Sequence, residues 1–242
     1  MPIFDPLLRR LVARVVYDGP GFSGKTTNVA RICDTFPVEK RTEMYTPGAL
    51  KGRTMFFDWL EVELGKLGRI PIFCQVLSVP GQRARSYRRR PLIKTADAVV
   101  FVADSREGPI DETRRSHALM RRYLRERGED VPYIVQANKQ DAEDAFSVSA
   151  LRNVLRVPAQ VPIVPAVAHR GNGVKETFNA AVKAAIRFAQ ATVSERGLQG
   201  IAGTADNPDG LLDALLALED QVDEFADEED PSEEEMLGAE AI

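Results

Sequence analysis

Short runs of apolar, β-branched residues alternate along the chain with longer segments whose apolar positions recur every three or four residues. The runs predict strands near residues 11–17, 55–64, 71–79, 98–104, 133–137 and 162–166, and the periodic segments predict helices near 25–34, 111–127, 148–156 and 174–194. Such alternation is typical of an α/β three-layer domain with a mostly parallel sheet. Gly65-Lys-Leu-Gly68 joins two of the strands and predicts one antiparallel edge hairpin.

A glycine-rich segment lies between the first strand and the first helix. It reads Gly19-x-x-x-x-Gly24-Lys25-Thr26, the P-loop pattern in the context that a P-loop requires. Backbone N–H groups of such a loop surround phosphate oxygens, the lysine reaches the β- and γ-phosphates, and the threonine hydroxyl binds Mg2+. The predicted phosphate-binding residues here are Gly19, Gly21, Phe22, Ser23, Gly24, Lys25, Thr26 and Thr27. The fold class is therefore a P-loop NTPase.

A second polar motif, Asn138-Lys139-Gln140-Asp141, directly follows the predicted strand 133–137. In open α/β sheets, ligands bind at the carboxyl ends of strands, so this motif suits a base-binding loop. The Asp141 carboxylate would accept both N1–H and N2–H2 of guanine, whereas adenine offers no such pair of donors. Lys139 would cover the purine face, and Asn138 would tie this loop to the P-loop. The motif predicts guanine as the base.

Six segments together resemble the Ras-like small GTPases, and in particular the bacterial gliding-motility and polarity GTPases of the MglA type. They are Gly19–Thr26, Gly52–Asp58, Ser78–Gln82, Phe101–Ser105, Asn138–Asp141 and Ala166–Ala168 before Gly173. The resemblance covers roughly residues 10–194. It implies a Ras-like G domain, GTP hydrolysis to GDP, Mg2+, an MglB-like (roadblock-type) activating protein and effectors that bind the switch regions.

The resemblance also implies roles for individual residues. Gln82 would position the attacking water, and Gly81 would offer its N–H to the γ-phosphate. Thr54 of switch I would bind Mg2+ together with Thr26, and Arg53 would act as an arginine finger in cis. Val167 and Ala168 would complete the guanine-binding site with the Asn138 motif.

One position departs from most small GTPases, which carry an aspartate three residues before the switch II glycine. This chain has Ser78 there, as MglA-like proteins also lack the acid. A neutral hydroxyl is a weaker partner for a metal-bound water than a carboxylate. Asp58, on the strand after switch I, is a possible substitute carboxylate.

Charge divides the chain into two parts. Residues 195–242 contain 16 acidic residues and one arginine, net −15, which leaves 31 basic and 20 acidic residues, net +11, in 1–194. The predicted organisation is a G domain over 1–194 and a tail over 195–242. The tail is expected to contain a glycine-marked flexible linker, a short amphipathic helix and an acidic disordered end. The apolar positions of that helix are Leu211, Leu215, Leu218, Val222 and Phe225.

Basic residues concentrate in switch II and in the helix after residue 111. They are Arg83, Arg85, Arg88, Arg89, Arg90, Lys94, Arg114, Arg115, Arg121, Arg122, Arg125 and Arg127. Three interpretations remain open: a solvated face, an intramolecular dock for the acidic tail, or a patch for anionic lipid or an acidic partner. Nucleic acid is disfavoured because no aromatic stacking platform accompanies the arginines.

Cys33 and Cys74 lack metal-ligand spacing and are expected to be buried thiols in a reducing compartment. His117 and His169 receive no chemical role. No signal peptide, lipidation motif or transmembrane run is apparent, so a cytoplasmic location is expected. The predicted function is a Mg2+-dependent GTPase switch that controls cell polarity or motility. The alternative is a nonhydrolysing GTP-binding scaffold that recruits partners through its tail, while a P-loop kinase or ATPase is disfavoured by Asn138-Lys139-x-Asp141.

Overall fold

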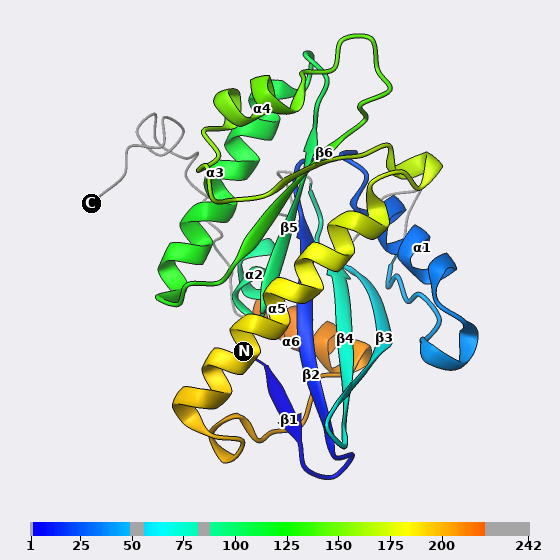
Figure 1. Ribbon diagram of the computed structural model, residues 1–242, viewed down its shortest axis with the longest axis vertical. Coiled ribbons are helices and arrows are strands. Elements are labelled where there is room, and N and C mark those ends of the chain that lie inside the picture. Colours follow the sequence, from blue (N-terminus) through cyan, green and yellow to red (C-terminus); the bar gives the residue numbers. More distant parts are fainter. Residues whose placement is uncertain (1, 49–55, 82–87, 221–242) are drawn as a thin grey trace.

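A computed structural model describes residues 2–48, 56–81 and 88–220 of the protein. Its centre is a seven-stranded sheet in the order β3-β4-β2-β5-β6-β7, with β1 paired to β2 beside this path (Figure 1). The strands are β1 (Ile3–Asp5), β2 (Arg10–Asp18), β3 (Asp58–Leu67), β4 (Ile70–Ser78), β5 (Ala98–Asp104), β6 (Tyr133–Asn138) and β7 (Ile163–Pro165). β2, β4, β5, β6 and β7 run parallel, and β3 pairs antiparallel with β4.

Helices cover both faces of the sheet, which makes the predicted three layers (Figure 1). The helices are α1 (Lys25–Thr35), α2 (Arg89–Lys94), α3 (Ile110–Arg127), α4 (Val148–Leu155), α5 (Val174–Arg196) and α6 (Pro208–Asp220), with short 3-10 turns η1 (Val38–Lys40), η3 (Ala168–Arg170) and η4 (Gln199–Ile201). Side chains of α1 and α5 share one buried cluster with the sheet, and those of α2, α3, α4 and α6 share the other.

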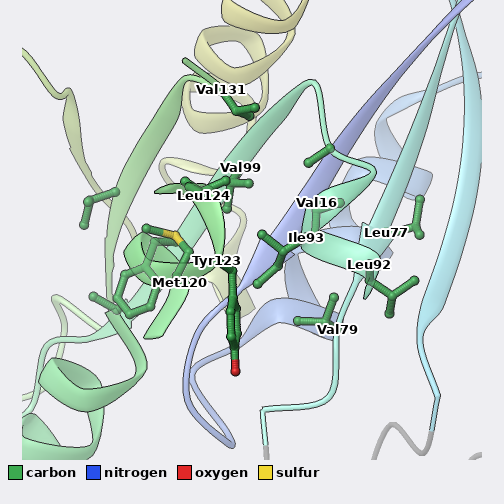
Figure 2. Close-up of a cluster of buried hydrophobic side chains, with 14 of the residues drawn as sticks. Val16, Leu77, Val79, Leu92, Ile93, Val99, Met120, Tyr123, Leu124 and Val131 are labelled. Carbon is green, nitrogen blue, oxygen red and sulfur yellow. The ribbon is translucent and has the colours of Figure 1, made fainter. Parts of the chain in front are cut away.

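Periodicity in the sequence explains these layers. All seven residues of β5 are buried, as expected for a central parallel strand whose two faces are both covered. Along α5, Phe178, Ala181, Ala185 and Ala189 are buried at helical spacing and form the stripe that packs on the sheet. Figure 2 shows the opposite cluster, to which α2 contributes Leu92 and Ile93 and α3 contributes Met120 and Tyr123.

Three local features differ from the expectations. The short strand β1, which pairs antiparallel with β2, was not predicted, and neither was α2. Strand β3 extends to Leu67, so the hairpin turns at Gly68-Arg69 rather than across residues 65–68. Gly65 instead lies at a register shift between Glu63 and Gly65, where its φ of 142° is one that glycine adopts readily. The unpredicted elements β1 and α2 are too short to produce a periodic signal in the sequence.

The segment after α5 packs against the sheet, although its glycines suggested a flexible linker. Ile201 and Ala205 are buried, and Ala202 forms a parallel bridge with Phe4 of β1. Leu211 and Leu215 of α6 are buried, as the amphipathic pattern predicted. The rest of the predicted tail, including Val222, Phe225 and the acidic run, lies outside the described residues. Among the helices of the described ranges, none has the length and apolar character to cross a membrane.

The buried histidine of α3 makes the stability of the fold depend on pH. The His117 ring lies 4.9 Å from the Phe101 ring and 5.8 Å from the Tyr133 ring, between centroids. Its Nε2 is buried without a hydrogen-bond partner among the described residues. Burial, together with the nearby charge of Arg121, lowers the pKa of His117 to about 3. Protonation at Nε2 would therefore bury a charged N–H that has no acceptor among the described residues.

We expect acid to destabilise the protein through this histidine. Because the folded-state pKa lies below the unfolded value of about 6.5, the stabilisation is complete above pH 6.5 and decreases as the pH falls toward 3. Between pH 8 and pH 5 the free energy of unfolding should fall by about 2 kcal/mol from His117 alone. Urea unfolding at pH 8 and pH 5 measures this fall in the free energy of unfolding. In His117→Phe the fall should be smaller by about 2 kcal/mol. An unchanged acid loss in His117→Phe would contradict the assignment.

Candidate functional site

The glycine-rich loop begins where β2 ends and wraps around the first turn of α1. Gly19 has a φ of 144°, and a Cβ there would lie 2.3 Å from the carbonyl oxygen of Val102. Gly24 has a φ of 104°, and its Cβ would lie 2.4 Å from Nδ2 of Asn138. Larger residues at either position would strain the backbone and collide with neighbours, so the loop conformation explains both glycines.

The other phosphate-loop residues surround the start of α1. Gly21 and Thr27 are half-buried, and Phe22 has a φ of 61° and an exposed side chain, so Phe22 offers the loop its backbone only. Ser23 is buried, and its hydroxyl has no hydrogen-bond partner among the described residues. A buried hydroxyl in this position is available to an additional ligand.

The Lys25 ammonium is held inside the loop. Its Nζ donates to the carbonyl oxygens of Gly19 at 2.9 Å and Pro20 at 2.7 Å. Burial lowers the pKa of Lys25 to about 8, although the carboxylates of Asp18 and Asp58 oppose the shift. Gly81 lies against the same place, because a Cβ on it would be 2.4 Å from Lys25 Nζ and 2.6 Å from the Pro20 carbonyl. The loop therefore positions one cation beside Gly81.

A cluster of oxygen atoms lies beside Thr26. The Thr26 hydroxyl donates to Asp58 Oδ2 at 2.6 Å, and the Thr46 hydroxyl donates to Asp58 Oδ1 at 3.0 Å. The Ser78 hydroxyl also donates to Asp58 Oδ2. Asp58 and Ser78 are register partners in the β3–β4 hairpin, and both are fully buried. The hairpin thus places the Asp58 carboxylate of β3 beside Ser78 of β4, the position at which most small GTPases carry an aspartate.

Asn138 joins the glycine-rich loop to the loop after β7. Its Nδ2 donates to the Ser23 carbonyl at 2.7 Å, and its Oδ1 accepts from the Ala168 N–H at 2.9 Å. Val167 is half-buried at the start of the turn η3, and Ala168 is buried. These three segments, far apart in the sequence, therefore meet at the carboxyl edge of the sheet.

Lys139 and Asp141 lie at the same edge. Lys139 has a φ of 66°, and its Nζ forms an ion pair with Asp104 at 2.6 Å. Arg106 donates to the same carboxylate through Nε at 3.0 Å and Nη2 at 2.9 Å. Burial alone would raise the pKa of Asp104, but the hydrogen bonds from Arg106 and Lys139 outweigh it and lower the pKa. The ion pair with Asp104 thus fixes the Lys139 side chain within the loop Asn138–Asp141.

Asp141 is accompanied by two nitrogen-bearing side chains that the sequence did not assign to the site. Its Oδ2 lies 3.6 Å from His169 Nε2 and 3.7 Å from Arg170 Nη2. Asn28 and Gln136 were also missed, and their side-chain amides exchange two hydrogen bonds of 2.8 Å beneath the loop. Only Asp104 had a signal in the sequence, as the polar residue that ends the buried strand 98–104.

The placement of all three predicted catalytic residues stays a prediction, because Arg53, Thr54 and Gln82 lie outside the described ranges. Several of the basic residues that follow Gln82 in the sequence have partners within the domain. Arg89 is buried against Asp18, with its Nη2 2.8 Å from Asp18 Oδ2. Arg90 and Lys94 both pair with Glu126, and the Arg88 guanidinium lies 4.2 Å above the Phe56 ring centroid.

A glycine-rich loop between a parallel strand and a helix, joined by one asparagine to a second polar loop, defines a P-loop GTPase. The profile of the ADP-ribosylation factor family matches residues 59–185. The mutual gliding-motility protein MglA of Myxococcus xanthus is 34% identical over 178 residues, which cover 72% of this chain and 91% of that protein. The chain belongs to the ADP-ribosylation factor family of small GTPases and is MglA-like within it.

A solved structure has the same fold. The Arl6 BBS3 small GTPase of Trypanosoma brucei, determined with the nucleotide analogue GppNp, superposes with a TM-score of 0.55. The match covers 73% of this chain and 98% of that chain at 23% identity. The Ras-like G domain predicted from the sequence is thereby confirmed. The protein is a GTP-binding switch with GTPase activity, as its family membership implies.

Proposed function

We propose that the protein is a Mg2+-dependent switch that alternates between GTP and GDP states and controls cell polarity or motility. The observation that supports this best is the oxygen cluster around Asp58, directly beside the P-loop threonine. Membership of a GTPase family favours hydrolysis over the alternative of a nonhydrolysing scaffold. The role in polarity or motility is inferred from the likeness to MglA of Myxococcus xanthus, which is named as a gliding-motility protein.

The residues beside the P-loop suit a hard cation. Mg2+ prefers oxygen ligands and usually binds through one or two protein groups, with water and substrate phosphates completing its shell. Thr26, Asp58, Thr46 and Ser78 supply only hydroxyl and carboxylate oxygens. In the described ranges there is no cluster of three His, Cys, Asp or Glu residues, so protein side chains there would not enclose a metal alone. We assign Thr26 as the direct ligand, with Thr54 as the second.

In this proposal Asp58 orients a metal-bound water, the task that most small GTPases give to an aspartate at the position of Ser78. Mg2+, when bound, would neutralise charge on the β- and γ-phosphate oxygens during hydrolysis. Lys25 and the N–H groups of Gly19, Gly21–Thr27 and Gly81 hold the phosphates. Asn138, Lys139, Asp141, Val167 and Ala168 hold guanine. Gln82 orients the attacking water, and Arg53 compensates the charge that develops.

The likeness to MglA also supports proposals on partners and boundaries. An MglB-like activating protein and effectors would bind the switch regions, and residues 1–194 would form the G domain. Residues 195–242 would form a regulatory extension. Single-turnover hydrolysis of GTP by the full chain, with and without Mg2+, tests the central proposal. Hydrolysis that requires Mg2+ is expected; tight GTP binding without turnover, even with a cognate activator, would favour the scaffold.

Asp58→Asn is expected to raise the Mg2+ concentration needed for half-maximal GDP retention by about tenfold, or about 1.4 kcal/mol. The amide keeps the shape of the carboxylate but loses its charge and part of its capacity to accept three hydroxyl donors. A Mg2+ titration of GDP release measures the change. Glu63→Gln, on the same strand, is the matched control and should leave the titration unchanged. Equal titrations for both variants would remove Asp58 from the metal site.

A further inference from the structure

The segment that follows α5 returns to the sheet and continues into α6 behind the strands (Figure 1). We call residues 199–217 the C-terminal arm. At its start, Gly203 N–H donates to the Phe4 carbonyl of β1 at 3.0 Å, and Ile201 is buried. The family profile ends at residue 185, before the arm begins.

Polar contacts fix the middle of the arm to the central strands. The Arg14 Nη2 atom of β2 lies 2.7 Å from Asp206 Oδ2. Gln75 of β4 donates from Nε2 to the Asp206 carbonyl at 2.9 Å, and its Oε1 accepts from Arg14 at 2.7 Å. Arg14 is buried, and its guanidinium lies 5.7 Å from the Trp59 ring centroid. Asp206 therefore supplies a negative charge to a buried cation, which specifies where the arm docks.

Apolar contacts hold α6 to the same face. Leu211 and Leu215, one helical turn apart, belong to the buried cluster that contains Phe57, Trp59 and Leu77. Leu216, on the next position of the helix, is 40% exposed. A helix of this length is marginal in water without a partner, so docking on the sheet is what stabilises it. The arm consequently covers β3 close to the position where β3 begins.

Contacts continue from the arm to the oxygen cluster around Asp58. Tyr45 packs against the buried cluster that contains Leu211 and Leu215 of α6. Burial and a hydrogen bond to Asp209 raise the pKa of the Tyr45 hydroxyl, and the charges of Asp209 and Asp213 also raise it. Tyr45 is paired with Trp59 through two backbone hydrogen bonds of 2.9 and 2.8 Å. The next residue, Thr46, donates to Asp58, and Asp58 accepts from Thr26. A continuous set of contacts thus links the arm to the P-loop threonine.

We propose that the C-terminal arm acts in cis to position Tyr45 and Thr46, and through them Asp58, so that docking of the arm strengthens retention of Mg2+ and GDP. The inference rests on the proposed function of the Asp58 cluster as a metal site. An arm that is released, for example by a protein that binds α6 or the face beneath it, would weaken the metal site and accelerate nucleotide release. The arm is then the site where nucleotide exchange is regulated.

The test compares two adjacent leucines in the full-length chain. Leu215→Asp places a carboxylate in the buried cluster, whereas Leu216→Asp places one on the exposed side of the same helix. Trp59 is the single tryptophan of the chain, so its emission reports whether the arm covers β3. Release of a fluorescent GDP analogue is measured at low and at saturating Mg2+. Both readouts use the same protein samples.

We expect Leu215→Asp to shift the Trp59 emission to longer wavelength and to accelerate GDP release about tenfold at low Mg2+, a coupling typical of linked sites. Saturating Mg2+ should abolish the difference, because excess metal compensates for a weakened site. Leu216→Asp should match the wild-type protein in both readouts. A red-shifted emission with unchanged GDP release at low Mg2+ would overturn the proposal and leave the arm as a structural cover.

Asp209→Ala provides a second test that keeps the apolar docking face. It removes the carboxylate that Tyr45 contacts, so emission should stay as in the wild type while GDP release at low Mg2+ accelerates. If Leu215→Asp does not fold, unchanged release in Asp209→Ala overturns the proposal. Failure of the proposed function can be told apart from failure of this proposal by the wild-type protein alone. If the wild-type protein does not bind the GDP analogue, or binds it without Mg2+ dependence, the metal site itself is refuted.

Discussion

Arg89→Ala is expected to lower the free energy of unfolding by about 3–5 kcal/mol. The Arg89 guanidinium donates from Nε to Asp18 Oδ1 at 3.0 Å and from Nη2 to Asp18 Oδ2 at 2.8 Å. Its Nη2 also donates to the Ser116 hydroxyl of α3 at 3.0 Å. Asp18 is fully buried, so loss of the guanidinium leaves a carboxylate without this partner and away from water. Urea unfolding of the nucleotide-free protein measures the loss.

A neighbouring arginine provides the control for this prediction. Arg90 pairs with Glu126 at 2.7 Å, but its side chain is 51% exposed. Arg90→Ala should therefore cost only about 0–1 kcal/mol. The double variant Asp18→Asn with Arg89→Ala should be more stable than Arg89→Ala alone, because both charges are then absent. A loss below about 1 kcal/mol in Arg89→Ala would mean that another cation, such as Lys25, neutralises Asp18.

This ion pair shows which parts of the site the sequence predicts and which it does not. The P-loop could be predicted because Gly19, Gly24, Lys25 and Thr26 are close in sequence and each has a local reason to be there. The pairing of Asp18 with Arg89 joins residues 71 positions apart. In the sequence, Arg89 is one of several neighbouring basic residues. Nothing in such a run indicates which arginine is buried.

Asp58 lies between these two cases. The missing acid at Ser78 raised the question of a substitute, and the predicted hairpin placed a carboxylate on the adjacent strand. The exact register decides whether it reaches Ser78, because a shift of one residue would turn the side chain to the other face. The structure pairs Asp58 directly with Ser78. Burial then distinguishes this carboxylate from an exposed one on an edge strand.

The C-terminal arm could be predicted as a helix but not as part of the core. Leucines at helical spacing indicate an apolar face, yet they do not say what covers it. One of the three interpretations of the basic residues docked the acidic tail on switch II, and that idea stays a prediction because residues 82–87 and 221–242 lie outside the described ranges. Within the described residues, Asp206 of the arm pairs with Arg14 on β2. Arg14 lies in the middle of a largely apolar strand, and a buried charge there needs a partner from elsewhere in the chain, but the sequence does not indicate which residue supplies it.

Asn138→Ala is expected to weaken GDP binding by about a hundredfold, or about 2.7 kcal/mol. The side chain satisfies the Ser23 carbonyl and the Ala168 N–H at the same time, so truncation leaves two buried backbone groups without this partner. Each such group costs about 1–3 kcal/mol when it remains unsatisfied. Ser23 belongs to the phosphate loop and Ala168 to the proposed guanine-binding loop. Loss of the two Asn138 hydrogen bonds therefore removes the side chain that holds these two parts of the nucleotide site together.

Equilibrium titration with a fluorescent GDP analogue measures this effect, and Gln140→Ala is its control. Gln140 lies in the same loop, but its Nε2 donates to the Phe146 carbonyl at 3.0 Å and does not bridge to the phosphate loop. The affinity of Gln140→Ala for the GDP analogue should stay within about threefold of the wild-type value. Asn138→Asp keeps the acceptor for Ala168 but sets a carboxylate oxygen against the Ser23 carbonyl, so its affinity for the GDP analogue should be no higher than that of Asn138→Ala. Wild-type affinity in Asn138→Ala would show that the two loops are positioned independently, and the proposed guanine site would then need another support.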